Sequence, residues 1–229
     1  MTLAEAKKEA PYLCDVHEGI GGDGVVVYDK GKECDFDFHI INRDGTEAEM
    51  CGNALRCLIR HNGEIGKKIT VMTKAGIKSG VYNGTNVSIN LSKPVSFDTD
   101  PIKISYNGMD IEGKRINVGN PHFVIERKYD EQLAEFLSEC REFFPDRTNV
   151  EFVTYRDDEI FMRVYERGCG ETMACGTGAA AAFIAGGKNS AVVHLIGGTL
   201  KCRLNDDGEI IQTGKAVYNY QGEWSKCLR

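Results

Sequence analysis

The sequence has no apolar stretch long enough to span a membrane and no excess of basic residues. Lysine and arginine number 28 against 34 aspartate and glutamate residues, so the formal net charge is −6. A chain without a basic face has little with which to neutralise phosphates, which argues against nucleic-acid binding. Residues 1–13 mix lysine with glutamate and do not resemble a signal peptide. We therefore expect a cytoplasmic protein without membrane association.

The sequence contains nine cysteines, an odd number that cannot all pair in disulfides within the chain. Reduced thiols fit such a count better than disulfides do. Two cysteine pairs, Cys51/Cys57 and Cys169/Cys175, are each separated by five residues. Structural zinc sites usually separate paired ligands by about two to four residues, so we predict no metal.

One stretch of the chain occurs twice, first at residues 42–53 and again at 166–177. The alternating apolar residues that precede each copy also match and indicate a strand before each one. Such a repeat predicts two copies of one supersecondary unit that face each other. At a constant offset, the paired residues are Arg43 with Arg167, Glu47 with Glu171, Cys51 with Cys175 and Gly52 with Gly176.

The repeat divides the 229 residues into two lobes, which we place at 1–100 and 101–229, with the C-terminal tail packing back on the first lobe. Hydrophobic residues make up 41% of the chain, enough for real cores. The patterns predict helices at 3–17 (interrupted near Pro11), 54–61, 130–143 and 176–185. They predict strands at 25–28, 34–42, 69–75, 77–82, 86–92, 102–107, 115–124 (broken by an Asn-Pro turn), 149–155, 159–166, 190–196, 199–204, 209–213 and 216–220. The helix at 176–185 is almost entirely alanine and must be buried all round, which suggests a central helix wrapped by strands.

In each copy of the repeat, a cysteine and a glycine stand where a strand or loop turns into a helix. Unpaired N–H groups and the helix dipole stabilise a thiolate or a bound carboxylate there, so we expect lowered thiol pKa values. Two facing copies put Cys51 and Cys175 on opposite sides of one ligand. One thiolate can then remove a proton from carbon while the other thiol returns one to the opposite face. We interpret the other cysteines as buried core residues: Cys14, Cys34, Cys57, Cys140, Cys169, Cys202 and Cys227.

Several motifs resemble those of the diaminopimelate epimerase family, over nearly the whole chain from about Leu13 onward. They are Gly19–Gly24, Asn42–Cys57 with its Met-Cys-Gly-Asn sequence, Gly119–His122, Thr148–Phe152, Glu166–Gly178, Gly197-Gly198 and Thr213-Gly214. The resemblance implies a cofactor-independent epimerase that interconverts LL- and meso-2,6-diaminoheptanedioate for lysine and cell-wall synthesis.

The resemblance also implies roles for individual residues. Cys51 and Cys175 would be the acid/base pair. The other implied contacts are Gly52, Asn53, Gly176 and Thr177 for the reacting carboxylate, Asn42, Asn120, Asn149 and Arg167 for the distal amino-acid end, and Glu166 near the reacting ammonium. His122 is a candidate for tuning a thiol, and a structural role after Asn-Pro is the alternative.

The sequence departs from the family pattern in its first half. The second half has a Gly-Asn-Pro-His turn at residues 119–122, whereas the matching Gly-Asn-Asp-Phe element of the family is not present before Asn42. We therefore expect an N-terminal lobe that lacks this strand, which bears on its closure and on full activity but not on the cysteine chemistry.

The sequence thus predicts an α+β fold of two pseudosymmetric lobes, each of mainly antiparallel strands curled around a central helix, with the active site in the cleft between them. The predicted partner is a small amino-acid substrate, and self-association into a homodimer is left open. Two alternatives remain: a related cofactor-free racemase for another amino acid such as histidine or proline, and an inactive ligand-binding or redox-sensing remnant.

Overall fold

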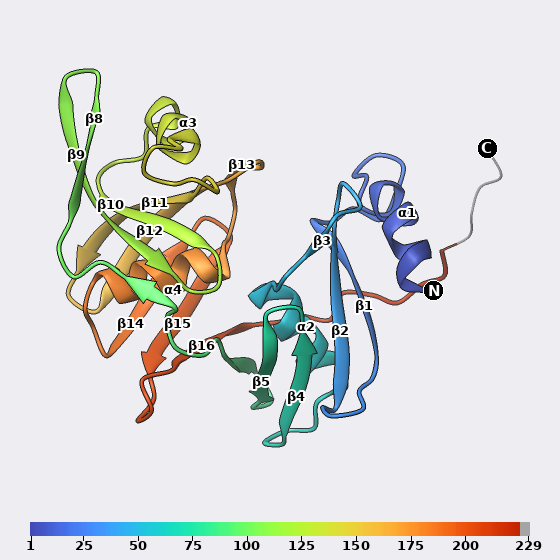
Figure 1. Cartoon of the computed structure of the whole chain (residues 1–229). Helices are drawn as coiled ribbons and strands as arrows, with labels where there is room; N and C mark the ends of the chain where they lie inside the picture. Colours follow the sequence, from blue (N-terminus) through green and yellow to red (C-terminus); the bar gives the residue numbers. More distant parts are fainter. Residues whose placement is uncertain (225–229) are drawn as a thin grey trace.

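The computed structural model describes residues 1–224, which form two lobes side by side (Figure 1). The first lobe has two helices and six strands before residue 91. Its elements are α1 (Leu3–Leu13), β1 (Gly24–Lys30), β2 (Phe36–Asn42), β3 (Glu47–Ala48), α2 (Gly52–Asn62), β4 (Lys68–Thr73), β5 (Gly76–Tyr82) and β6 (Asn86–Asn90). Thr2 and Glu5 form a capping box at the start of α1.

The second lobe continues with strands and two more helices. Its elements are β7 (Ser96–Phe97), β8 (Ile102–Tyr106), β9 (Met109–Asn117), β10 (Pro121–Glu126), α3 (Glu131–Glu139), β11 (Asn149–Arg156), β12 (Glu159–Glu166), β13 (Gly170–Thr172), α4 (Gly176–Ala185), β14 (Ser190–Leu195), β15 (Gly198–Leu204) and β16 (Ile210–Lys215). Within residues 1–224, no helix is both long and apolar enough to cross a membrane.

One strand path runs through both lobes in the order β1-β2-β4-β5-β6-β16-β15-β14-β12-β11-β10-β9-β7. The lobes join where β6 and β16 pair antiparallel, with Asn90 opposite Ile211 and Asn86 opposite Lys215. The sheet curls around α2 on one side of this junction and around α4 on the other (Figure 1). The division of the chain at residue 100 stays a prediction.

The two lobes repeat one pairing scheme. In the first, β2 pairs antiparallel with β1 and parallel with β4; in the second, β12 pairs antiparallel with β11 and parallel with β14. The short strands β3 and β13 pair antiparallel with β2 and β12, respectively, and each precedes a central helix. This scheme confirms the predicted α+β fold of two pseudosymmetric lobes.

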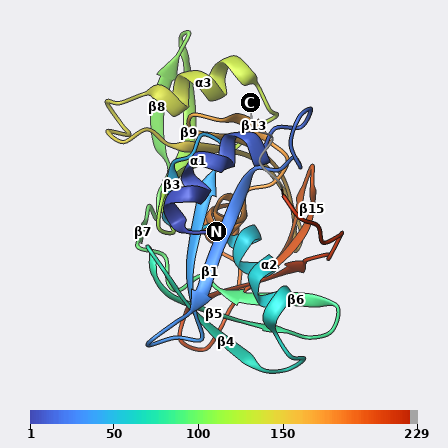
Figure 2. The same cartoon turned by 90° about the vertical axis from the view of Figure 1, so that its right-hand side faces the viewer.

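The lobes differ at their outer edges. In the second lobe, β10 pairs parallel with β11 and antiparallel with β9. In the first lobe, the equivalent strand β1 ends the strand path, and α1 lies against β1 and β2 (Figure 2). Among residues 1–224, β9 and β10 therefore have no counterpart beside β1.

The buried helix predicted in the second lobe is confirmed. In α4, the side chains of Ala179, Ala180, Ala181, Ala182 and Phe183 are all fully inaccessible. Small side chains let strands approach the helix closely from several directions, which explains the alanine-rich sequence. Helix α2 is amphipathic instead, with Leu55, Leu58 and Ile59 buried and Cys57 exposed.

Two predicted helices end earlier than expected, and one predicted strand is absent. Helix α1 runs without interruption through Pro11 to Leu13, and the Asp15 carboxylate then accepts from the backbone N–H groups of His17 and Glu18, which stabilises a turn instead of further helix. Helix α3 ends at Glu139, where the chain enters turns at 141–143. The strand predicted at 216–220 is absent: the backbone there forms no ladder, and Tyr218 stacks on His61 with ring centroids 6.1 Å apart.

The predicted burial of the remaining cysteines is partly wrong. Cys14 and Cys202 are buried, whereas Cys57 and Cys169 are exposed and Cys34 and Cys140 are half-buried. The Cys57 side chain lies on the outer face of α2, and Cys169 lies in the turn after β12. Cys227 lies outside the described residues.

Candidate active site

Cys51 and Cys175 are the N-cap residues of α2 and α4, as the repeat predicts. Both have extended backbone conformations, with φ of −138° and −123°. The Cys175 Sγ atom accepts from the Gly178 N–H at 3.3 Å and lies 3.4 Å from the Thr177 Oγ1 atom. Each thiol therefore stands at the positive end of a helix dipole.

The starts of the two helices touch each other. A Cβ atom on Gly176 would lie 3.7 Å from the Cα of Gly52 and 3.9 Å from the Asn53 Oδ1 atom. Glycine at both positions keeps the helix ends this close, so the N–H groups of the two first turns lie together. Two helix N-termini in contact form a strong anion-binding site.

A buried glutamine ties the helix ends together. The Gln212 side chain of β16 accepts from Arg56 Nη1 at 2.8 Å and donates to the Gly176 carbonyl at 2.8 Å. Arg56 also donates to the Asn53 Oδ1 atom. The sequence analysis missed the roles of Arg56 and Gln212, although a glutamine directly after Ile210 and Ile211 in a predicted strand was a signal for a buried polar contact.

Glu166 influences both thiols electrostatically. Its carboxylate, at the end of β12, accepts from the Thr172 hydroxyl at 2.5 Å. The negative charge of Glu166 raises the pKa of Cys51 and also that of Cys175. One carboxylate therefore influences thiols from both lobes.

The expected lowering of the thiol pKa values is wrong. Burial is the main influence on both thiols and raises the pKa of Cys51 and, more strongly, that of Cys175. At Cys51, the backbone N–H groups of Ala54 and Asn53 and the Arg56 charge act in the opposite direction. At Cys175, Glu166 and Glu151 add to the effect of burial. Desolvation of the thiolate thus outweighs the helix dipole.

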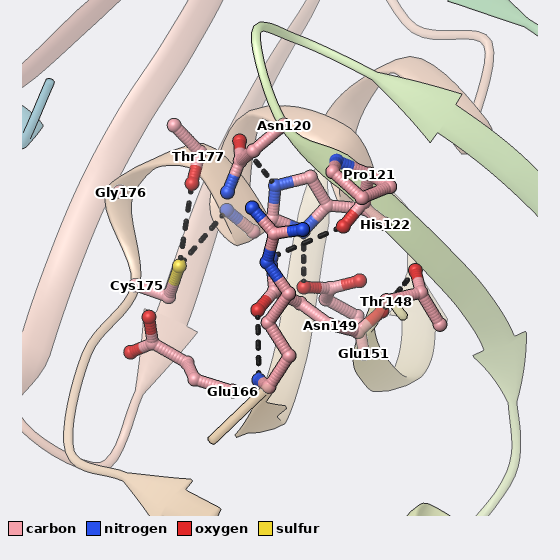
Figure 3. Close-up of polar contacts among 12 residues, drawn as sticks. Asn120, Pro121, His122, Thr148, Asn149, Glu151, Glu166, Cys175, Gly176 and Thr177 are labelled. Carbon is pink, nitrogen blue, oxygen red and sulfur yellow. Dashed lines mark hydrogen bonds and ion pairs between the residues drawn. The ribbon is translucent and has the colours of Figure 1, made fainter. Parts of the chain in front are cut away.

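His122 contacts a carboxylate and an amide rather than a thiol. Its Nδ1 atom lies 2.6 Å from the Glu151 Oε1 atom, and its Nε2 atom lies 3.0 Å from the Asn120 Oδ1 atom (Figure 3). Both His122 and Glu151 are buried. Glu151 was not predicted as a site residue, because its partner lies on another strand.

Asn149 connects three segments of the second lobe. Its amide donates to the Pro121 carbonyl at 3.1 Å and accepts from the Arg167 N–H at 3.0 Å. The Arg167 guanidinium donates to the Asp146 carbonyl at 2.9 Å. Asn149 therefore holds the starts of β10 and β11 against the turn that carries Arg167.

Asn42 is the last residue of β2, just before the turn of the first lobe that matches the Arg167 turn, and its amide donates to the Thr46 hydroxyl at 3.0 Å. Burial raises the pKa of Cys169 in the turn after β12, and the charges of Glu166 and of Asp44 in the first-lobe turn add to this effect. The charge of the turn after β2 therefore acts on a thiol in the turn after β12, across the two lobes. Within residues 1–224, no group of three or more His, Cys, Asp or Glu residues is arranged to hold a metal ion.

Comparisons with known proteins agree with this geometry. A family model described as "Diaminopimelate epimerase" matches residues 2–97 and 115–219. A diaminopimelate epimerase of Parabacteroides distasonis is 40% identical over 226 residues, which cover 90% of this chain and 84% of that protein. One of Methanococcus maripaludis is 37% identical over 247 residues, covering 93% of this chain and 88% of that protein.

Solved structures show the same fold at low sequence identity. A hydroxyproline epimerase from Agrobacterium vitis, solved with bound trans-4-hydroxy-L-proline, aligns with a TM-score of 0.66 at 16% identity, covering 90% of this chain and 76% of that chain. This likeness shows the fold alone. The family match and the identity to the curated relatives show that the chain belongs to the diaminopimelate epimerase family.

Proposed function

We propose that this protein interconverts LL- and meso-2,6-diaminoheptanedioate by proton exchange at Cα between Cys51 and Cys175. One observation carries the proposal: a thiol stands at each of two helix N-termini that touch, one from each lobe. Proton removal on one face of a carbon and delivery on the other inverts its configuration. The chemistry requires no cofactor, because thiol and thiolate perform both steps.

The paired helix starts suit the α-carboxylate of the substrate. The N–H groups and the positive dipole ends of the two helix starts favour an anion there, beside the Asn53 amide and the Thr177 hydroxyl. The glycines Gly52 and Gly176 let the carboxylate approach the backbone. Glu166 lies near both thiols and offers a negative charge to the α-ammonium group.

Epimerisation takes place in two proton-transfer steps. The thiolate of one cysteine takes the Cα proton and becomes a thiol, while the C–H electron pair stays on the substrate as a carbanion. The carbanion then takes the proton of the opposite thiol, which becomes the new thiolate. Helix dipoles at the carboxylate stabilise the developing charge. A thiol of raised pKa gives a stronger base once ionised, which suits a weakly acidic C–H bond.

The distal amino-acid end of the substrate requires polar partners of its own. We assign it to the Asn120 amide and the Arg167 guanidinium, with Asn42 contributing from the first lobe. Arginine binds carboxylates in a two-pronged manner, and an amide serves either an ammonium or a carboxylate. Asn149 supports this end by positioning Arg167 and Pro121.

We further infer that the enzyme acts in the cytoplasm. The described cysteines are free, including the exposed Cys57 and Cys169. Exposed thiols persist in a reducing compartment.

The test is to incubate the purified protein with LL- or meso-diaminopimelate in deuterated water. Each isomer should convert to the other with deuterium at Cα, and a variant with both Cys51 and Cys175 replaced by alanine should do neither. L-Proline and L-histidine serve as competing substrates. Faster exchange in either would assign a different racemase activity, and binding of diaminopimelate without any exchange would indicate an inactive remnant.

A further inference from the structure

Glu151 is a buried carboxylate that the proton-transfer steps do not use. Its side chain on β11 is fully inaccessible, and its Oε2 atom has no hydrogen-bond partner within residues 1–224. Its Oε1 atom contacts His122 Nδ1 at 2.6 Å. Burying a carboxyl group with one oxygen unpaired is costly, so this position calls for a role other than stability.

The hydrogen bonds fix where the ring protons of His122 lie. The Asn120 Oδ1 atom, 3.0 Å from Nε2, can only accept, so Nε2 carries a hydrogen. One further proton then lies between Nδ1 and Glu151. It belongs either to an imidazolium beside a carboxylate or to a carboxylic acid beside a neutral ring, and the pair is neutral overall in both forms.

We propose that Glu151 is a positioning residue that, through His122, orients the Asn120 amide toward the substrate. By occupying Nδ1, Glu151 keeps the hydrogen on Nε2, and this hydrogen holds the Asn120 oxygen. The amide nitrogen of Asn120 is thereby turned away from the ring, toward Thr177 and Cys175 in the view of Figure 3. The inference rests on the proposed function, in which Asn120 binds the substrate.

The packing around Glu151 supports this role. A Cβ atom on Gly178 would lie only 2.7 Å from Glu151 Oε1, so glycine there leaves room for the carboxyl group under the first turn of α4. The titratable groups that act on Glu151 or respond to it come from four elements: His122 on β10, Glu166 on β12, Cys175 at α4 and Tyr155 on β11 itself. Of these, only His122 is bonded to it.

Two substitutions separate positioning from simple packing. In Glu151→Gln, the new amide donates to Nδ1 and keeps the hydrogen on Nε2, so the KM for diaminopimelate should stay within about threefold of the parent. In Glu151→Leu, this restraint is lost and KM should rise about tenfold, with a smaller change in kcat. In an Asn120→Ala background, Glu151→Leu should cause no further rise in KM.

The chain offers a matched control in a second Glu–His pair. Glu159 contacts the His194 Nε2 atom at 3.2 Å. This pair is partly exposed and takes no part in the proposed positioning of Asn120. Glu159→Leu should leave KM unchanged. Thermal unfolding of every variant shows whether a change in KM follows a general loss of stability.

A second readout does not depend on turnover. Nitrogen-15 NMR of labelled histidine, with His122→Asn to assign the signal, should show hydrogen fixed on Nε2 in the parent and in Glu151→Gln. If Glu151→Leu fails to fold, the spectra of the parent and of Glu151→Gln still show which ring nitrogen of His122 carries the hydrogen. Hydrogen on Nδ1 alone in the parent, or equal KM values in folded Glu151→Leu and the parent, would overturn the proposal. Absence of turnover in the parent would instead refute the proposed function, and the NMR measurement would stand.

Discussion

Arg56 and Gln212 lie in different lobes, yet the guanidinium of one donates to the side-chain oxygen of the other at 2.8 Å. Gln212 is fully buried, and Arg56 is only 4% exposed. The same glutamine donates to the Gly176 carbonyl, so it connects Arg56 of α2 with the first turn of α4. The distance between the two thiol-bearing helix ends therefore depends on this contact.

Replacement of Gln212 by leucine should destabilise the protein strongly. The substitution removes the acceptor of the buried Arg56 Nη1 group and leaves only the Asn53 contact, while the Arg56 Nε atom already has no partner within residues 1–224. We expect the free energy of unfolding in urea to fall by about 2–3 kcal/mol. Gln212→Glu keeps an acceptor for Arg56 and should lose less. Equal stability of the leucine variant and the parent would contradict the assigned contact.

Single replacement of Cys51 or Cys175 by serine should reduce epimerisation by several orders of magnitude. Serine is a far weaker acid than a thiol and a far poorer base. Each variant should still bind substrate and exchange the Cα proton slowly with solvent, without inversion, in the isomer whose C–H bond faces the remaining thiol. The two variants should therefore prefer opposite isomers, which proton NMR in deuterated water would reveal. A Cys51→Ser variant with the parent rate would rule out the two-thiol mechanism.

The thiols should ionise only at alkaline pH in the free enzyme. Burial raises both pKa values above the ordinary cysteine value of about 8.5, so the thiolate fraction stays low at neutral pH and grows as the pH rises. Since the folded pKa values exceed the unfolded ones, the thiols contribute stability below about pH 8.5 and lose it as the pH rises through the folded pKa values.

The pH at which each thiol ionises can be measured separately. The rate of alkylation by iodoacetamide, followed by peptide mass spectrometry, should rise at higher pH for Cys175 than for exposed cysteines such as Cys57. Glu166→Gln removes a charge that raises the pKa of both Cys51 and Cys175, so it should shift both alkylation profiles to lower pH. Activity should be bell-shaped in pH, because it requires one thiolate and one thiol together. Half-maximal alkylation of Cys175 below pH 7 would contradict the assignment.

Replacement of Gly178 by alanine should disturb the first turn of α4. The added Cβ atom would lie 2.7 Å from Glu151 Oε1 and 3.3 Å from the Cys175 Cβ atom. We expect a loss of about 1–3 kcal/mol in the free energy of unfolding, together with reduced activity. Gly222→Ala is the matched control, because no atom lies within 4 Å of the added group. Similar unfolding curves for both variants would disprove the close approach of Glu151.

The architecture was predictable because the sequence contains an internal repeat. The matching residues around Cys51 and Cys175, with an apolar alternating strand before each, predict paired strand–turn–helix units, and the structure confirms them. The alanine-rich sequence of α4 predicts a helix buried on every side, which is also confirmed. Local patterns of this kind carry their own structural cause, either periodic burial or the free N–H groups of a helix start.

The site contacts that were not predicted join residues far apart in the sequence. Gln212 lies 156 residues from Arg56, and Glu151 lies 29 residues from His122. No local pattern indicates such partners. The thiol pKa values were mispredicted for a related reason: the helix dipole is visible in the sequence, whereas the burial that outweighs it is a property of the assembled lobes. The backbone of residues 216–220 likewise forms no strand, although its residue types favour one.

The pairing of β6 with β16 sets the order in which the enzyme can mature. Asn90 of the first lobe meets Ile211, so this junction forms only after the ribosome has added the residues through β16. Each lobe can begin to collapse earlier around its own helix, as domains generally do during synthesis. Until β16 is in place, however, Cys51 has no opposing thiol at a fixed distance. A nascent or truncated chain can therefore be folded in part and still be inert.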